Sequence, residues 1–315
     1  MRRRRLVYER TKRKKLHFGA TDKDYGLAEP LIETISEELL NEKKLDFIQK
    51  LSLVNKKDIE KKTRDQNKNV EWFQERKIRL TASKFGELCK MKPYTSCKKK
   101  VHSMLYKLPA KSKEMDHGIE FESHARTQFQ NMFNLQVTLC GLIVDPELPY
   151  LAASPDGLVE SNSIIEIKCP YTARDTVDAV SAVNNKLLQY CIVSENNKKM
   201  KLKKNHDYYY QIIGQLHITQ KEKCYFIIHT KNWTNVEIIL YDNEFWNTQM
   251  ANKLKLFYTN CILPEIVDPL FGRRLSVEDI RDPPSILEAQ KVQNEKLAAN
   301  RHVKKKLKTK NKNLL

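Results

Sequence analysis

Glycine is scarce in this chain: eight occur among 315 residues, and no G-x-x-x-x-G-K segment is present. A phosphate-binding loop of that kind needs its glycines so that backbone N–H groups can surround the phosphates, so a P-loop ATPase is excluded. Long apolar runs are also lacking, because no stretch approaches the roughly 20 apolar residues that span a bilayer. The charged amino-terminal segment is not followed by an apolar one, so we predict neither a membrane span nor a secretory signal.

Paired cysteines are missing as well. The seven cysteines are widely spaced, odd in number and form no C-x-x-C pair. The sequence therefore predicts reduced thiols in an intracellular protein, not a disulfide framework or a zinc site. His117 and His124 lie seven residues apart, without the i, i+4 spacing of a helical zinc-ligand pair.

Acidic residues are outnumbered: 39 Asp and Glu stand against 57 Lys and Arg, which gives a formal net charge of +18. This excess predicts a polyanionic partner and says nothing about the fold. Nucleic acid is the expected partner, since no amphipathic lipid-binding helix stands out. Residues 1–15 form a basic arm, equally typical of a nuclear-localisation or phosphate-binding segment and of a solvated, disordered start. In a eukaryotic host we expect a nuclear protein.

The most informative segment is 152–174, AASPDGLVESNSIIEIKCPYTAR. Residues i and i+2 of a strand share a face, so Ile165 and Ile167 are expected to face a core, and Glu166 and Lys168 the other side. Burying a carboxylate and an ammonium is costly unless they are paired or hold a metal. By itself, a Glu-x-Lys pair is best explained as a structural ion pair on a half-exposed strand.

Asp156 changes that interpretation. Residues 160–163, Glu-Ser-Asn-Ser, predict a turn, and a hairpin centred on Ser161 sets Asp156 opposite Glu166. Directly opposed Cβ atoms in an antiparallel pair lie roughly 4.5–5.5 Å apart. Two carboxylates at that separation can bind one hard cation such as Mg²⁺. Lys168 beside them can polarise an attacking water or offset charge on a phosphate.

The order Asp, then Glu-x-Lys, resembles the PD-(D/E)xK nuclease signature. SPDGL followed by IIEIKCPYTARD is more specifically similar to the YqaJ-type viral recombinase family, which includes the lambda phage exonuclease. Three further motifs occur in the family's order within residues 70–261. They are Trp72, Arg76, Leu80 and Thr81-Ala82-Ser83; Gly118, Glu122 and Ala125; and Tyr208 with Gln211. Each motif is weak alone, whereas four in order make a specific match.

The resemblance implies roles for seven residues. It implies that Asp156, Glu166 and Glu122 bind a metal ion, Mg²⁺ or Mn²⁺, and the motif favours Glu122 over Glu120. Lys168 and Gln211 are the residues implied to orient water and stabilise the transition state. Arg76 and Ser83 are implied to bind a DNA phosphate, which suits the planar guanidinium of arginine. Without the motif, Glu122 would be ordinary surface and Arg76 a residue on a solvated helix face.

The fold class implied is α/β: a restriction-endonuclease-like core with a mixed central sheet flanked by helices, and basic helical or disordered extensions. We expect a basic arm and helical extension over residues 1–69, the nuclease domain over 70–262 and a basic tail over 263–315. Periodicity predicts helices at 27–54, 115–133, 173–183, 206–219 and 242–258, strands at 135–144 and 150–153, a hairpin over 223–240 and a charged connector at 55–69. Thr81 or Ser83 is expected to cap the second of two helices within 70–90.

The function implied is a Mg²⁺-dependent exonuclease that degrades one strand of linear duplex DNA from 5′ ends in recombination or repair. An annealing protein is the implied partner and a ring-shaped trimer the implied assembly. Three alternatives remain open: a DNA-binding module without activity, a PD-(D/E)xK endonuclease that cuts internally, and a scaffold protein. A scaffold would explain the charge but not the clustering of Asp156, Glu166 and Lys168.

Overall fold

The structure, a computed structural model, describes residues 34–107, 112–195 and 199–312. The chain divides into two compact units, residues 1–36 and 37–315, and every element below belongs to the second. The basic arm 1–15 and the start of the predicted helix 27–54 lie outside the described residues. Within those residues, no helix has both the length and the apolar character needed to cross a bilayer.

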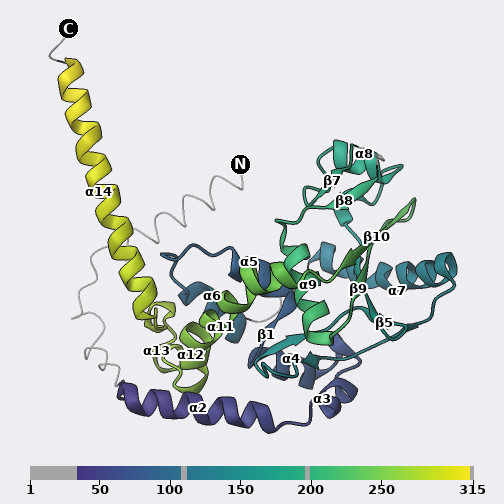
Figure 1. Ribbon diagram of the computed structural model, residues 1–315, viewed down its shortest axis with the longest axis horizontal. Coiled ribbons are helices and arrows are strands. Elements are labelled where there is room, and N and C mark those ends of the chain that lie inside the picture. The colour runs from purple at the N-terminus through teal and green to yellow at the C-terminus, as the bar shows by residue number, and fades with distance from the viewer. Residues whose placement is uncertain (1–33, 108–111, 196–198, 313–315) are drawn as a thin grey trace, which may run out of the picture. The chain divides into compact units, whose positions relative to one another are not determined.

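The second unit contains a five-stranded mixed sheet, drawn towards the right of Figure 1. Its order is β10-β9-β6-β5-β2, in which β6 and β9 are parallel and the other neighbours antiparallel. The strands are β2 (Val137–Thr138), β5 (Gly157–Val159), β6 (Ser163–Lys168), β9 (Lys223–His229) and β10 (Thr234–Leu240). The predicted hairpin over 223–240 is formed by β9 and β10.

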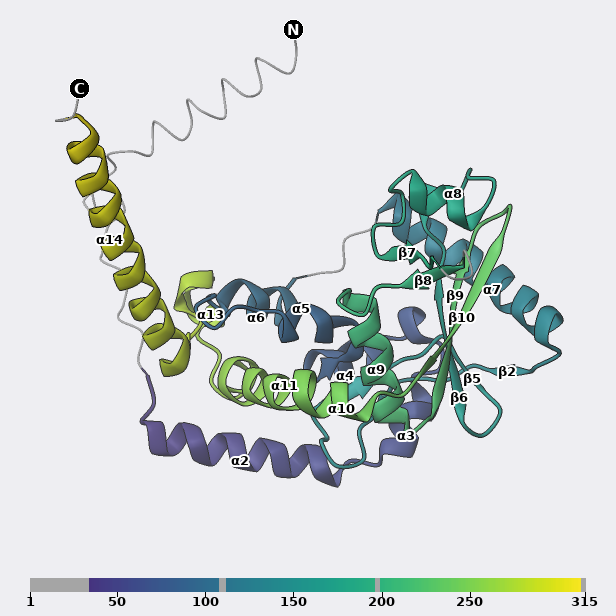
Figure 2. The same cartoon turned by 45° about the horizontal axis from the view of Figure 1, so that its top comes forward.

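Successive residues of β6 pack on two different helices. Ile165 and Ile167 belong to a cluster with α7 (Lys113–Phe133), whereas Ile164 joins the main core with α9 (Asp207–Thr219). The two helices therefore cover opposite faces of the sheet (Figures 1 and 2). This arrangement confirms the predicted restriction-endonuclease-like α/β class and the helices at 115–133 and 206–219.

A smaller, three-stranded sheet leads into two of the sequence motifs, because one of its strands ends at Thr81 and another ends directly before Ser154. Its order is β1 (Leu80–Thr81), β4 (Leu151–Ala153) and β3 (Ile143–Val144), with β1 and β4 parallel. The predicted cap at Thr81 or Ser83 is wrong: neither hydroxyl bonds to a helix, and the two lie 3.3 Å from each other. Thr81 is instead the last residue of β1, and a short 3-10 turn over Ala82–Lys84 follows it.

The predicted connector at 55–69 is also wrong, because it contains α3 (Lys56–Lys62) and η2 (Gln66–Lys68). Asn55 caps α3, since its side chain accepts hydrogen bonds from two backbone N–H groups of the first turn. Ile59 is buried in a small cluster with residues of β3 and β4. One apolar residue among six charged ones gives no periodic stripe, which is why the pattern hid this helix.

The other elements complete the unit around the two sheets. Before and between the strands lie α2 (Glu37–Leu53), α4 (Val70–Lys77), η3 (Ala82–Lys84), α5 (Phe85–Cys89), α6 (Lys98–Leu105), η4 (Tyr171–Ala173), α8 (Ala179–Asn184) and the hairpin β7 (Cys191–Val193) and β8 (Met200–Leu202). After β10 lie α10 (Asn243–Phe245), η5 (Trp246–Ala251), α11 (Asn252–Phe257), η6 (Tyr258–Ile262), α12 (Leu263–Val267), α13 (Phe271–Arg274), η7 (Val277–Asp279) and α14 (Pro284–Lys312).

Three predicted segments differ in extent. The helix predicted at 173–183 begins only at Ala179, where Asp178 caps it. The helix predicted at 242–258 continues through wider π turns to Val267. Within the predicted tail, Asp268 is buried and paired with Arg281, so this part packs on the unit.

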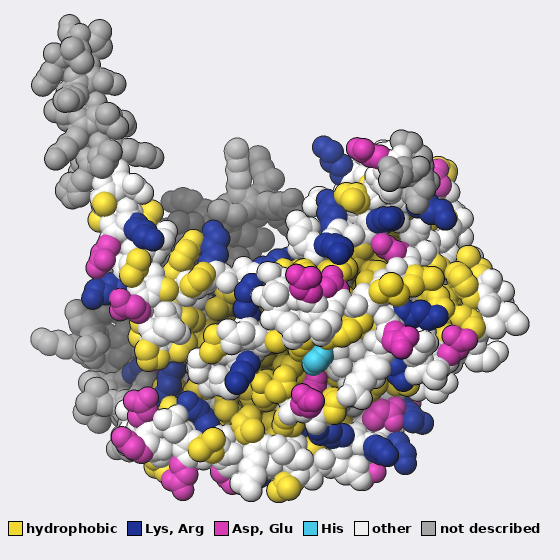
Figure 3. Space-filling model, viewed as in Figure 1, with side chains coloured by type: hydrophobic (Ala, Val, Ile, Leu, Met, Phe, Trp, Pro, Cys, Tyr) yellow, Lys and Arg dark blue, Asp and Glu magenta, His cyan; other side chains and the backbone are white. Residues whose placement is uncertain are grey.

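Basic and acidic side chains are interspersed on the face drawn in Figure 3.

Candidate active site

The β5–β6 hairpin brings the predicted carboxylates together. Its register pairs Gly157 with Ile165 and Val159 with Ser163, so it is centred on Ser161 as predicted. Extending the pairing by one residue sets Asp156 opposite Glu166. Asp156 bonds to both neighbours of Glu166: its N–H donates to the carbonyl of Ile165 at 3.1 Å, and its Oδ2 accepts from the N–H of Ile167 at 2.6 Å.

The carboxylate of Glu166 is 2% exposed and receives three hydrogen bonds. Lys168 Nζ donates to Oε1 at 2.5 Å, and Gln211 Nε2 donates to the same oxygen at 2.7 Å. Gln215 Nε2 donates to Oε2 at 2.7 Å. Both amides come from α9, where residues four apart share a face. The helix over the sheet thus fixes the orientation of this carboxylate.

Lys168 is held over an aromatic ring as well as against Glu166. Its Nζ lies 4.6 Å from the centre of the Tyr208 ring, a cation–π distance. Burial opposes the charge of this ammonium, but the carboxylates of Glu166 and Asp156 outweigh burial and raise the pKa of Lys168. The side chain is therefore a cation at neutral pH.

Negative charge is concentrated around Asp156. Burial raises the pKa of Asp156, and the charges of Glu166 and Glu122 raise it further. Burial likewise raises the pKa of Glu122, against the attraction of Arg126 at 2.5 Å. Glu120, the competing candidate, is exposed on α7. Burial and neighbouring negative charge disfavour the ionisation of Asp156 and Glu122, so a bound cation would stabilise this site.

This donor set fits a hard divalent cation, although a three-ligand cage is not preassembled. Among residues 34–107, 112–195 and 199–312, no three His, Cys, Asp or Glu side chains are grouped closely enough to hold a metal. Glu122 accepts a hydrogen bond from Arg126. Mg²⁺ needs only one or two carboxylates because it keeps several waters. Asp156 and Glu166 meet that requirement.

Arg76 lies beside this site through Trp72. Its guanidinium carbon is 4.0 Å from the centre of the Trp72 ring, and Trp72 Nε1 donates to Ser154 Oγ at 2.9 Å, two residues before Asp156. Burial lowers the pKa of Arg76 to about 10. In the part of the chain that the structure describes, Arg76 has no carboxylate partner, whereas the nearby Arg79 is buried and paired with Glu75.

Ser83 is placed by the pairing of β1 with β4. The parallel pairing of β1 and β4 sets Thr81 beside Ala152. Ser83 and Ser154, each two residues further on, therefore leave the sheet at the same end. Ser83 is exposed, and within the described segments its hydroxyl has a hydrogen-bond partner only in the hydroxyl of Thr81. The structure thus gathers Asp156, Glu166, Lys168 and Gln211 directly, and leaves Ser83 without a contact to them.

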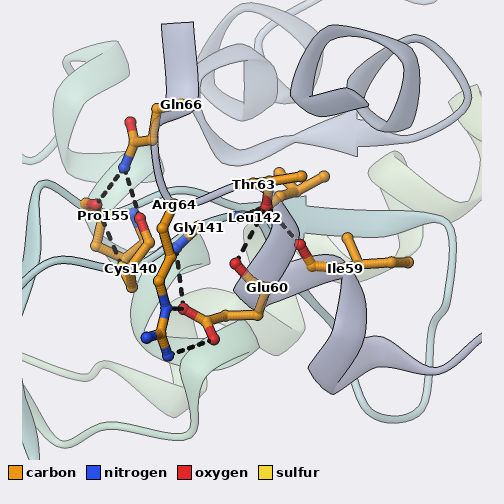
Figure 4. A network of polar contacts seen from close by, with 9 residues as sticks. All are labelled: Ile59, Glu60, Thr63, Arg64, Gln66, Cys140, Gly141, Leu142 and Pro155. Atoms are coloured by element: carbon orange, nitrogen blue, oxygen red, sulfur yellow. Dashed lines mark hydrogen bonds and ion pairs between the residues drawn. The ribbon is translucent and has the colours of Figure 1, made fainter. Parts of the chain in front are cut away.

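Two residues of the site were not assigned from the sequence. Gln215 lies four residues after Gln211, and that spacing was the available signal. Gln66 lies in the supposed connector, and its Nε2 donates to the carbonyls of Cys140 at 2.9 Å and of Pro155 at 3.1 Å (Figure 4). Pro155 directly precedes Asp156, so Gln66 fixes the turn that carries the carboxylate.

Comparison with known proteins gives one family match. Residues 71–222 match the model of the YqaJ-like viral recombinase domain. No curated protein matches.

Solved structures similar to this chain include three nucleases or nucleic-acid complexes. An alkaline exonuclease from Laribacter hongkongensis is 22% identical over 65% of this chain and 97% of its own, with a TM-score of 0.48. A phage-related exonuclease from Haemophilus somnus 129PT is 15% identical over 63% and 96%, with a TM-score of 0.41. SOX in a complex with DNA is 13% identical over 69% and 74%, with a TM-score of 0.44.

Proposed function

The chain carries a YqaJ-like viral recombinase domain, and on that premise we propose that it is a metal-dependent deoxyribonuclease acting on linear duplex DNA. The observation that carries the proposal is the buried carboxylate of Glu166, held by two amides and one ammonium opposite Asp156. A structural ion pair needs only the lysine. The two amide donors and the second carboxylate, Asp156, are instead what a site needs in order to stabilise charge that develops during a reaction.

The cofactor we propose is Mg²⁺, with Mn²⁺ as a substitute, held by Asp156 and Glu166 with Glu122 nearby. When bound, such an ion lowers the pKa of a water and offsets charge on a phosphate. The raised pKa of Lys168 suits it to stabilise negative charge in the transition state and not to act as a general base. Gln211 donates through its amide nitrogen, which leaves its carbonyl oxygen to accept a hydrogen bond from water.

Arg76 and Ser83 are the proposed phosphate-binding residues. The support for Arg76 is that its half-buried guanidinium is stacked on Trp72 and has no carboxylate partner among the described residues. A guanidinium in that state binds a phosphate in bidentate fashion. Ser83 offers an exposed hydroxyl at the same end of the β1–β4 pair. We propose that together they position one strand across Asp156.

One assay tests this function against its alternatives. The protein is incubated with Mg²⁺ and either linear duplex DNA, labelled at its 5′ or its 3′ ends, or closed circular duplex. We expect loss of the linear DNA alone, with the 5′ label released first. Nicking of circles would indicate an endonuclease, and binding without cleavage an inactive DNA-binding module.

The Asp156→Ala variant is the control for the site. We expect it to lose cleavage and to keep most of its DNA affinity, because Arg76 and the basic surface are untouched. Wild-type cleavage by this variant would exclude Asp156 from the chemistry and contradict the proposed site.

The proposed assembly is a ring-shaped trimer that works with a single-strand annealing protein, and it rests on the family resemblance alone. Light scattering of the purified protein, with and without linear DNA, measures the oligomeric state. A monomer under both conditions would contradict the trimer.

A further inference from the structure

A groove of about 430 Å³ lies between α3, the strand edges and the end of α9. We call it the α3 groove and define it by its charged residues: Lys56, Lys57, Glu60, Lys61, Arg64 and Lys221. Five cations thus line it with a single acid. Four of the cations come from α3 or its end, a segment that precedes the residues matched by the family model.

The only acid of the α3 groove is already neutralised. Both oxygens of Glu60 accept hydrogen bonds from Arg64 at 2.9 Å, and Oε1 also accepts from the N–H of Gly141 at 3.1 Å. The side chains of Lys57 and Lys61 are exposed and make neither a hydrogen bond nor an ion pair with the described residues. They lie four residues apart, so they project from the same face of α3. The groove therefore carries surplus positive charge.

The groove is fixed rigidly to the turn that carries Asp156. Thr63 Oγ1 accepts from the N–H of Leu142 at 2.7 Å, and Gln66 bonds to the carbonyl before Asp156 (Figure 4). A Cβ on Gly141 would lie 2.0 Å from the carbonyl of Glu60, which measures how closely the two segments approach. α3 therefore cannot shift without disturbing the turn.

The α3 groove and Asp156 are connected by the β-strand β5. Leu158 of β5 lines the groove and follows Asp156 by two residues, roughly 7 Å along a strand. That separation equals about two nucleotide steps of 3.4 Å on a duplex strand. A DNA strand with one phosphate at Asp156 that follows β5 would therefore bring its next phosphates to the residues that line the groove.

We propose that the α3 groove is a second DNA-backbone contact, added by the amino-terminal extension to the nuclease domain. Its occupant is the phosphate backbone of the strand that passes Asp156, and the argument is charge complementarity beside the site. The inference rests on the proposed function for its substrate. It adds that Lys57 and Lys61 determine how tightly the substrate is held, and not how fast a bound phosphate is cleaved.

The test compares two double variants with the same change in net charge. Lys57→Glu with Lys61→Glu reverses the groove, and Lys253→Glu with Lys255→Glu reverses two exposed lysines of α11, away from it. The Kd for a linear duplex is measured in EDTA over a range of salt, so binding is scored without cleavage. Steady-state kcat and KM are then measured with Mg²⁺.

For the groove variant we expect about tenfold weaker binding and a plot of log K against log salt that is shallower by about 2. Its KM should rise while kcat stays unchanged, and the α11 variant should change Kd less than twofold. An equal loss of DNA affinity in both variants would overturn the proposal. So would unchanged DNA binding in the groove variant, which is the result expected if the groove binds an acidic protein. Because binding is scored in EDTA, this result is independent of whether the protein cleaves DNA.

Discussion

At the scale of single residues, the site brings together carboxylates whose charged forms are electrostatically unfavourable. Burial raises the pKa values of Asp156 and Glu122, and the negative charge of neighbouring carboxylates raises them further. Hydrogen bonds from Lys168, Gln211 and the backbone hold the group together. Destabilising arrangements of this kind are typical of functional sites, where activity and stability trade against each other.

The first prediction concerns Asp156→Asn. The change removes the repelling charge and keeps an oxygen that can accept from the N–H of Ile167. We expect the free energy of unfolding in EDTA to rise by roughly 0.5–2 kcal/mol and cleavage to fall at least about 100-fold. Urea denaturation measures the former. The matched control is Asp175→Asn, which should lower stability, because Lys231 lowers the pKa of that exposed carboxyl. Destabilisation by Asp156→Asn would contradict the repulsion.

The second prediction concerns pH. A carboxyl with a raised pKa holds its proton longer in the native state than in the unfolded chain. The contribution of Asp156 and Glu122 to stability therefore falls as pH rises from about 4 through their native pKa values. Mg²⁺ requires the ionised carboxylates, so its stabilising effect should grow over the same range. We expect the difference in Tm between Mg²⁺ and EDTA to increase from pH 5 to pH 8, and to be lost in Asp156→Asn. A difference independent of pH would exclude these carboxyls as ligands.

At the scale of elements, α9 positions the site because it packs closely enough to reach Glu166. Gly214 lies inside this helix between Gln211 and Gln215, and a Cβ there would meet the Phe85 ring at 2.3 Å. Close packing around this glycine is therefore against Phe85 of α5. The cost of a mid-helix glycine, about 1 kcal/mol, is offset by the approach that it allows.

The third prediction compares two helical glycines. Gly214→Ala should lower the free energy of unfolding by roughly 1–3 kcal/mol, because the added methyl group overpacks a core contact. Gly118→Ala in α7 is the control: its Cβ would meet nothing within 4 Å, so stability should rise by roughly 0.5–1 kcal/mol. Thermal unfolding of both variants measures the difference. If Gly214→Ala were neutral, α9 would have room to move away from α5.

At the scale of the whole molecule, the excess of +18 is spread over surface and extensions. Basic and acidic side chains are interspersed on the face in Figure 3. Residues 295–315 contribute eight Lys and Arg against one Glu. Side chains 294–300, where this segment begins, are exposed. The segment is therefore expected to add affinity for a polyanion and not to stabilise the unit.

The fourth prediction concerns deletion of residues 295–315. The Tm should stay within about 1 °C, since no described side chain of this segment is buried. The affinity for duplex DNA should fall and its salt dependence become shallower, because fewer counterions are released. Fluorescence anisotropy at several salt concentrations checks both. Unchanged affinity would assign the DNA interaction to the remaining surface alone.

Local patterns predicted the hairpin and the core of the site. The turn at 160–163 and the two-residue period of a strand set Asp156 opposite Glu166, and these need only neighbouring residues. The helices at 115–133 and 206–219 followed from apolar periodicity in the same way. The predicted domain boundaries and the roles of all seven candidate site residues stay predictions.

Contacts between distant segments decided the rest. Gln215 lies 49 residues from Glu166, and Gln66 lies 89 residues from Pro155. No local period records such a pairing, because it exists only after α9 and α3 dock on the sheets. For the same reason the sequence could not show that Arg79 is paired with Glu75 while Arg76 has no carboxylate partner in the described part of the chain. The order of the chain by itself determined which groups are candidates for the chemistry, and packing determined which of them are held or paired among the described residues.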